Sequence, residues 1–80
     1  MNKNDLRKML TDSNIPKDTY SLDGGLPNEA YCLNQNGDRW EVYYSERAQK
    51  TGLKIFETES EACEYFYNSL VQMLKDMGVL

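Results

Sequence analysis

The chain of 80 residues contains no histidine. Histidine is the commonest general base, the usual partner of a nucleophilic serine or cysteine, and the commonest metal ligand. The only cysteines are Cys32 and Cys63, whereas a structural zinc site takes about four cysteine or histidine ligands. We therefore predict no catalytic residue, no cofactor and no bound metal, and we expect that the protein is not an enzyme.

Long apolar runs are missing as well. No stretch reaches the roughly 18 apolar residues that a membrane-spanning helix requires. Residues 1–8 contain no apolar segment that could serve as a signal peptide. We therefore expect a cytoplasmic protein without membrane contact, whose cysteines stay reduced.

Basic residues are outnumbered by acidic ones, nine against thirteen, which leaves a net charge of −4. Such a surface repels the phosphate backbone, so direct binding of nucleic acid is not expected. The same surface attracts a basic partner, because complementary charge accelerates encounter. Many soluble proteins are mildly acidic, so charge alone identifies no partner.

An apolar content of 40% is typical of a folded chain, and the length allows one small domain, residues 1–80. Residues 4–13 predict a first helix, because apolar side chains recur there every three or four positions. Asn4 is the expected N-cap, Asn14 can end the helix, and Pro16 prevents its continuation. The apolar stripe consists of Leu6, Met9 and Leu10.

The pair Asn36-Gly37 predicts a β-hairpin with a two-residue type I′ turn, since both residues tolerate positive φ. This turn opposes Gln35 to Asp38, Leu33 to Trp40, Tyr31 to Val42, and Glu29 to Tyr44. Side chains alternate between the two faces of a strand, so the hairpin has a core face and a wetter face. The core face carries Tyr31, Leu33, Trp40, Val42 and Tyr44. The wetter face carries Ala30, Cys32, Asn34, Arg39, Glu41, Tyr43 and Ser45.

The remaining segments complete an α+β domain. Residues 20–22 are extended, residues 23–28 form a turn-rich loop, 45–50 a polar turn and 51–56 a further strand. Leu53 and Ile55 are expected to face the core. A closing helix begins after Thr58, whose spacing to Glu61 matches a capping box, and Gly78 can end it. We predict an antiparallel sheet of three to four strands in the order α-β-β-β(-β)-α, with the helices packed on one face as a second layer.

Several residues of this hairpin carry side chains that occur in catalytic or binding sites. Glu41 and Glu46 need not converge on a substrate, so an acid–base pair is disfavoured against solvated or partner-facing charge. Cys32 has no base to activate it and is interpreted as a small residue that fills the sheet face. Tyr43 beside Glu41 is typical of a protein interface, where aromatic residues anchor and charges steer. The open alternative is that the first helix covers this face.

Three strings resemble a family of small bacterial immunity proteins: YSLDGGLPNE (20–29), WEVYYSER (40–47), and TGLKIF with ESEACEYF (51–56 and 59–66). These proteins are encoded beside polymorphic toxins, including contact-dependent growth inhibition toxins. Ala48 departs from the pattern, in which glycine is expected after YSER.

The resemblance implies a cytosolic protein that binds and neutralises the C-terminal domain of a neighbouring toxin. Many such domains are nucleases that act on tRNA or other RNA and have basic clefts, which an acidic protein could plug or flank. The predicted contacts, chosen from the wetter face and its adjoining loops, are Asp23, Glu29, Glu41, Tyr43, Glu46 and Arg47.

Two other classes of function stay open. The first is a general acidic adaptor that binds proteins through a sheet edge and forms a homodimer when free. The second is a small enzyme that uses Glu41, Tyr43 and Arg47, for which no substrate suggests itself.

Overall fold

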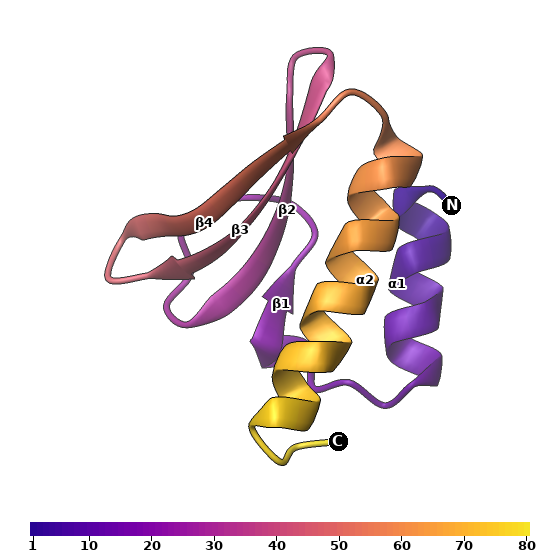
Figure 1. The fold of residues 1–80 in the computed structure, drawn as a ribbon, viewed down its shortest axis with the longest axis vertical. Coiled ribbons are helices and arrows are strands. Elements are labelled where there is room, and N and C mark those ends of the chain that lie inside the picture. Colours follow the sequence, from indigo (N-terminus) through magenta and orange to yellow (C-terminus); the bar gives the residue numbers. More distant parts are fainter.

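Two helices and a four-stranded sheet form the domain (Figure 1). The computed structural model describes all residues, 1–80. The elements are α1 (Lys3–Asp12), the short 3-10 helix η1 (Lys17–Thr19), β1 (Tyr20–Ser21), β2 (Ala30–Asn36), β3 (Arg39–Glu46), β4 (Gln49–Phe56) and α2 (Glu59–Asp76). This order confirms the predicted α+β class. No helix is long and apolar enough to cross a membrane.

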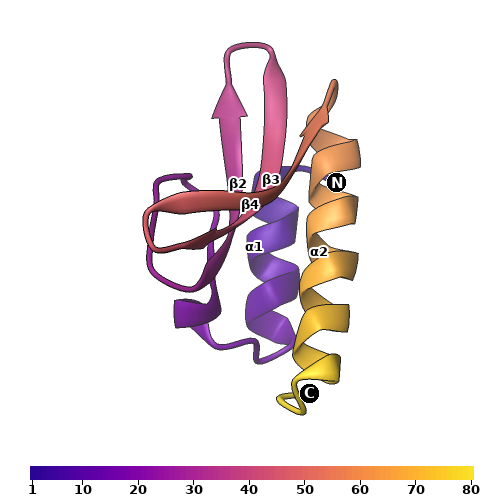
Figure 2. The same ribbon diagram turned by 60° about the vertical axis from the view of Figure 1, so that its left-hand side comes forward.

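The sheet has the strand order β1-β2-β3-β4, and both helices lie on one side of it (Figures 1 and 2). The hairpin β2–β3 and the hairpin β3–β4 are antiparallel, whereas β1 pairs with β2 in parallel. The sheet is therefore mixed and not wholly antiparallel as the sequence suggested. The parallel pairing arises because the chain returns from the end of β1 to the start of β2 through residues 22–29.

The main core fills the space between the helices and the sheet. It consists of Leu6, Leu10, Ile15, Leu22, Leu33, Val42, Ala62, Cys63, Phe66, Leu70 and Leu74. Aromatic rings extend it at two places: Tyr31 lies against Phe66, and Phe56 against Tyr65, each with ring centroids 5.1 Å apart. Such tilted pairs are a favourable arrangement of aromatic rings.

Both helices are capped at both ends. The N-cap of α1 is Asn2, in a reciprocal capping box with Asp5, so the prediction of Asn4 was wrong by two positions. Thr58 caps α2 as predicted, and its side chain accepts from the Glu61 N–H. Each helix ends in a Schellman motif, which is shown by the bonds from Ile15 N–H to Leu10 O and from Val79 N–H to Leu74 O. Asn14 and Gly78 hold the positive-φ positions of these motifs, as expected.

The turn between β2 and β3 differs from the prediction. Asn36 pairs with Arg39, so the two residues of the turn are Gly37 and Asp38. Only Gly37 has a positive φ, which is the requirement of a type II′ turn at its first central position. The register therefore shifts by two residues, and Leu33 faces Val42 instead of Trp40. An even shift keeps each side chain on its face, so the predicted alternation of faces holds.

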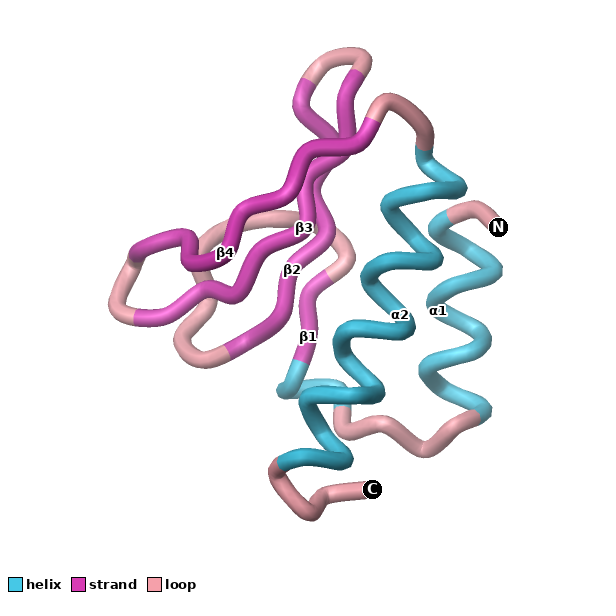
Figure 3. The backbone as a smooth tube through the Cα atoms, viewed as in Figure 1, coloured by secondary structure: helices cyan, strands magenta, loops and turns pink.

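The face of β2 and β3 opposite the helices is not wet. Residues 22–29 cross it (Figure 3), and the Tyr43 hydroxyl donates to the Gly25 carbonyl at 2.6 Å. Gly24 lies so close to Asn34 that a Cβ would come within 2.9 Å of the Asn34 Cγ, and its φ is +71°. Under this loop Cys32, Tyr43 and Ser45 are fully buried. The wetter face of the prediction is thus a second, smaller buried layer, covered by a loop and not by α1.

The strand β4 is longer and more exposed than predicted. The turn before it contains only Arg47 and Ala48, since Glu46 pairs with Gln49, so the predicted polar turn 45–50 is mostly strand. Leu53 and Ile55 are 43% and 54% exposed, which contradicts their predicted place in the core. Ile55 pairs with Glu41 on the face away from the helices, because a bulge between Val42 and Tyr44 offsets the strand.

Candidate protein-binding surface

Three of the six predicted contact residues meet at one end of the hairpin β2–β3. Glu29 precedes the pair Ala30–Ser45, and Glu46 and Arg47 follow it. All three side chains are exposed. We call Glu29, Tyr44, Glu46 and Arg47 the hairpin-end surface.

Tyr44 is the aromatic residue of this surface. It is partly exposed and does not belong to the aromatic residues packed on the main core. Partial burial, and then the negative charges of Glu29 and Glu46, raise the pKa of the Tyr44 phenol. A partly exposed tyrosine near two carboxylates offers an apolar anchor with a charged rim, the arrangement found at many protein interfaces.

The backbone of this surface is unusually constrained. Glu29, Arg47 and Ala48 have φ values of 56°, 51° and 60°, in the left-handed region that disfavours side chains with a Cβ. Two of these residues form the β3–β4 turn, and the third directly precedes β2. Strained backbone tends to concentrate at functional sites.

Glu41 lies elsewhere, on the opposite face, and is only 7% exposed. Its carboxylate accepts hydrogen bonds from Asn34 at 3.0 Å, from Asn36 at 3.4 Å and from the Lys50 ammonium at 3.1 Å. The Asn34 hydrogen bond, and then the hydrogen bond and charge of Lys50, lower the pKa of Glu41 against the effect of burial. Glu41 therefore organises the buried face and has few free acceptor positions for a partner.

Tyr43 is fully buried, so the expectation that its ring is exposed was wrong. Its hydroxyl bonds to Gly25, and the Lys50 ammonium lies 4.7 Å from the ring centroid. Burial, followed by nearby charges, raises the pKa of Tyr43 to about 12. With the loop 22–29 in place, Tyr43 presents no surface to a partner.

Asp23 is exposed and follows β1, the edge strand of the sheet that lies next to α1. Its carboxylate is 2.7 Å from the Lys3 ammonium and 3.8 Å from the Arg7 guanidinium. The hydrogen bond from Lys3 is the main reason why the pKa of Asp23 is lowered. Asp23 thus joins β1 to α1 and stands apart from the hairpin-end surface.

Charge is distributed unevenly along the chain. Residues 1–56 contain eight acidic and eight basic residues, whereas residues 57–80 contain five acidic residues and one lysine. The entire net charge of −4 therefore belongs to α2 and its flanks. Three of these acidic residues, Glu57, Glu59 and Glu61, precede or open the helix, where the helix dipole stabilises them.

The two cysteine thiols lie in the interior of the protein. Cys32 and Cys63 are free and fully buried on opposite faces of the sheet. Burial raises the pKa of both thiols, that of Cys63 to about 11, so neither is a thiolate near neutral pH. No group of three His, Cys, Asp or Glu side chains is close enough to hold a metal ion.

Sequence reasoning missed Tyr44 as a member of the surface, because strict alternation assigned it to the core face. The available signal was its place in the string Tyr44-Ser45-Glu46-Arg47 at the end of a strand. A core face is least covered where a strand reaches its turn.

No protein-family model matches the chain, and neither a curated protein nor a solved structure shows significant similarity to it.

Proposed function

We propose that this chain is a cytoplasmic immunity protein that binds and neutralises a cognate bacterial toxin domain. The observation that carries the proposal is the hairpin-end surface, in which Tyr44 lies near Glu29 and Glu46 beside the constrained β3–β4 turn. The resemblance of residues 20–29, 40–47, 51–56 and 59–66 to immunity proteins supports the choice of partner. The acidic charge favours a basic domain such as an RNase that acts on tRNA.

Inhibition then follows from simple occlusion. Glu29 and Glu46 lie opposite basic side chains of the toxin's substrate cleft or of its rim, and the Tyr44 ring packs on the apolar part of that surface. Such an inhibitor needs no catalytic group, and the complex contains one copy of each chain. Charged rim residues act mainly on the association rate, while a buried aromatic anchor acts mainly on dissociation.

The first experiment expresses the toxin domain encoded beside this gene, with and without this protein, and measures growth. We expect rescue and a stable one-to-one complex in size-exclusion chromatography with light scattering. The double variant Glu29→Lys/Glu46→Lys should slow association at least about tenfold and reduce its dependence on salt.

The matched control is Asp12→Lys/Asp18→Lys, which reverses two exposed acidic residues near α1 and leaves the hairpin end intact. It has the same change in net charge, so an equal loss of association rate would show that total charge, and not the hairpin-end surface, drives binding. Absence of both rescue and complex would remove the proposal.

A second candidate, a homodimeric adaptor, is favoured by one observation. The outer edge of β4 is unpaired, and the exposed Leu53 and Ile55 lie along it. An edge strand of this kind can pair with another strand. A dimer of the protein alone, at concentrations where no toxin complex forms, would favour the adaptor.

A further inference from the structure

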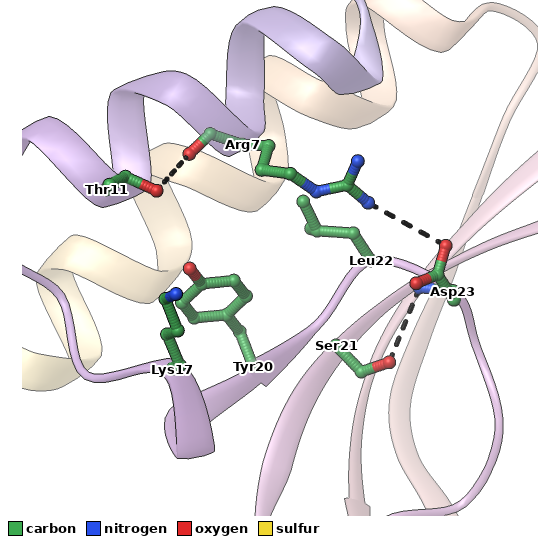
Figure 4. A pocket seen from close by; sticks show the side chains of 7 residues that line it. All are labelled: Arg7, Thr11, Lys17, Tyr20, Ser21, Leu22 and Asp23. Carbon is green, nitrogen blue, oxygen red and sulfur yellow. Dashed lines mark hydrogen bonds and ion pairs between the residues drawn. The ribbon is translucent and has the colours of Figure 1, made fainter.

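A cavity of about 340 Å³ lies between α1 and β1, on the opposite edge of the sheet from β4 (Figure 4). Its walls come from α1, η1, β1 and the two residues that follow β1. The lining residues are Arg7, Thr11, Lys17, Tyr20, Ser21, Leu22 and Asp23. The volume is within the range of roughly 300–1,000 Å³ that is usual for small-molecule sites.

Two cationic side chains of this cavity, Arg7 and Lys17, have no hydrogen-bonded acidic partner. Asp23, its one acidic residue, is paired with Lys3 at 2.7 Å, and Lys3 does not line the cavity. The guanidinium of Arg7 is 3.8 Å from the same Asp23 oxygen, beyond hydrogen-bond distance. Lys17 takes part in none of the four ion pairs of the protein. Lys17 therefore has no ionic partner within the protein, and the Arg7 guanidinium, in a long ion pair with Asp23, keeps its N–H donors free for an anion.

Two of the three hydroxyl groups that line the cavity already donate hydrogen bonds within the protein. Thr11 Oγ1 donates to the Arg7 carbonyl at 2.9 Å, and Ser21 Oγ donates to the Gly24 carbonyl at 3.0 Å. The Tyr20 hydroxyl has no such partner, and Figure 4 shows it directed toward α1 on the same side as the Lys17 side chain. Its ring and the side chain of Leu22 form the apolar part of the wall.

We propose that this cavity binds a small phosphate monoester. The Arg7 guanidinium, the Lys17 ammonium and the Tyr20 hydroxyl come from three different elements of the cavity wall, so they offer donors to several oxygens of a tetrahedral oxyanion. Arginine recognises phosphate through paired N–H donors, while lysine binds it as a point charge. The Tyr20 ring and Leu22 receive the organic group of the ester. The site is independent of the hairpin-end surface and of the proposed toxin partner.

The test titrates phenyl phosphate into ¹⁵N-labelled protein and follows amide chemical shifts. We expect saturable shifts that centre on residues 7–11 and 17–23, with affinity greater than for inorganic phosphate because the phenyl ring gains contact with Tyr20. Lys17→Gln and Arg7→Gln should each weaken binding about tenfold, the loss of one charge-assisted contact. Tyr20→Phe should weaken it several-fold and leaves the ring in place.

Lys8→Gln is the matched control, since Lys8 is exposed on α1 and does not line the cavity. An equal loss of affinity in this control would show that net charge, and not the cavity, determines binding, and it would overturn the proposal. Chemical-shift changes that do not saturate would also overturn the proposal. A phosphoserine pentapeptide that binds tenfold more tightly than phenyl phosphate would overturn the assignment of a free small molecule.

Discussion

At the scale of single residues, Glu41 has the most demanding environment. Its carboxylate is nearly buried, yet Asn34, Asn36 and Lys50 supply three hydrogen bonds that replace those of water. A buried charge is tolerated when its lone pairs are satisfied in this way. Lys50 also rests on the Tyr43 ring, so one cation joins β4 to both side chains.

Glu41→Gln should lower the free energy of unfolding at pH 7 by about 1–2 kcal/mol, because it removes charge-assisted hydrogen bonds in a protected place. Urea unfolding measures this change. Glu64 is exposed on α2, and Glu64→Gln should change the free energy of unfolding by no more than about 0.5 kcal/mol. Equal effects of the two changes would contradict a special role for Glu41.

The same residue makes stability depend on pH. The pKa of Glu41 is lowered in the folded protein, chiefly by the Asn34 hydrogen bond. Its contribution is therefore complete above the unfolded value of about 4.3 and is lost as the pH falls through the folded pKa. Stability measured from about pH 5 downward should fall less steeply in Glu41→Gln than in the unchanged protein.

At the scale of elements, positive φ at both turn residues, which was predicted for the β2–β3 turn, occurs instead in the β3–β4 turn. The favoured pair Asn36-Gly37 does not form the type I′ turn, since Gly37 and Asp38 occupy the turn positions. The β3–β4 turn instead has positive φ at both Arg47 and Ala48. Pairing along the strands, which is set by the buried side chains of both layers, outweighs the local preference of the turn residues.

Ala48→Gly tests this strain. A residue with a Cβ in the left-handed region costs about 1–2 kcal/mol, and glycine loses about 0.5–1 kcal/mol more conformational entropy on folding. We expect a net gain in stability of about 0.5–1 kcal/mol, measured as a rise in Tm. Ala48→Val should lower Tm, because a β-branched side chain tolerates φ of 60° poorly. A fall in Tm for the glycine variant would argue that the turn is not strained.

At the scale of the whole molecule, the free edge of β4 is the least protected feature. Its residues are exposed except for Phe56, which is partly buried. The opposite edge strand of the sheet, β1, has only two residues. Pairing of this edge with a second strand is opposed by the charges of Lys50 and Lys54 and by the bulge near Gly52.

Lys54→Val should therefore increase self-association, since it adds an apolar β-branched residue to the exposed edge strand and removes a charge from it. Light scattering over a concentration series measures the apparent mass. Lys8→Val removes a lysine from α1 and should leave the mass unchanged. If both variants associate equally, the edge of β4 is not the surface responsible.

Much of this structure could be read from the sequence. The spacing of Leu6 and Leu10 identified α1 and its buried side, and the capping box from Thr58 to Glu61 located the start of α2. Alternation along β2 and β3 assigned side chains to the correct faces even though the register was off by two residues. These properties depend on local period and on a few capping residues, which the chain carries within each element.

Only the tertiary structure decided which surfaces are free. Tyr43 is buried because the distant loop 22–29 folds over its face, and Leu53 and Ile55 are exposed because a bulge and the edge position of β4 remove them from the core. The hairpin-end surface and the cavity beside α1 likewise join segments far apart in the chain. A periodic pattern determines which way a side chain points, whereas its exposure depends on what another part of the chain places over it.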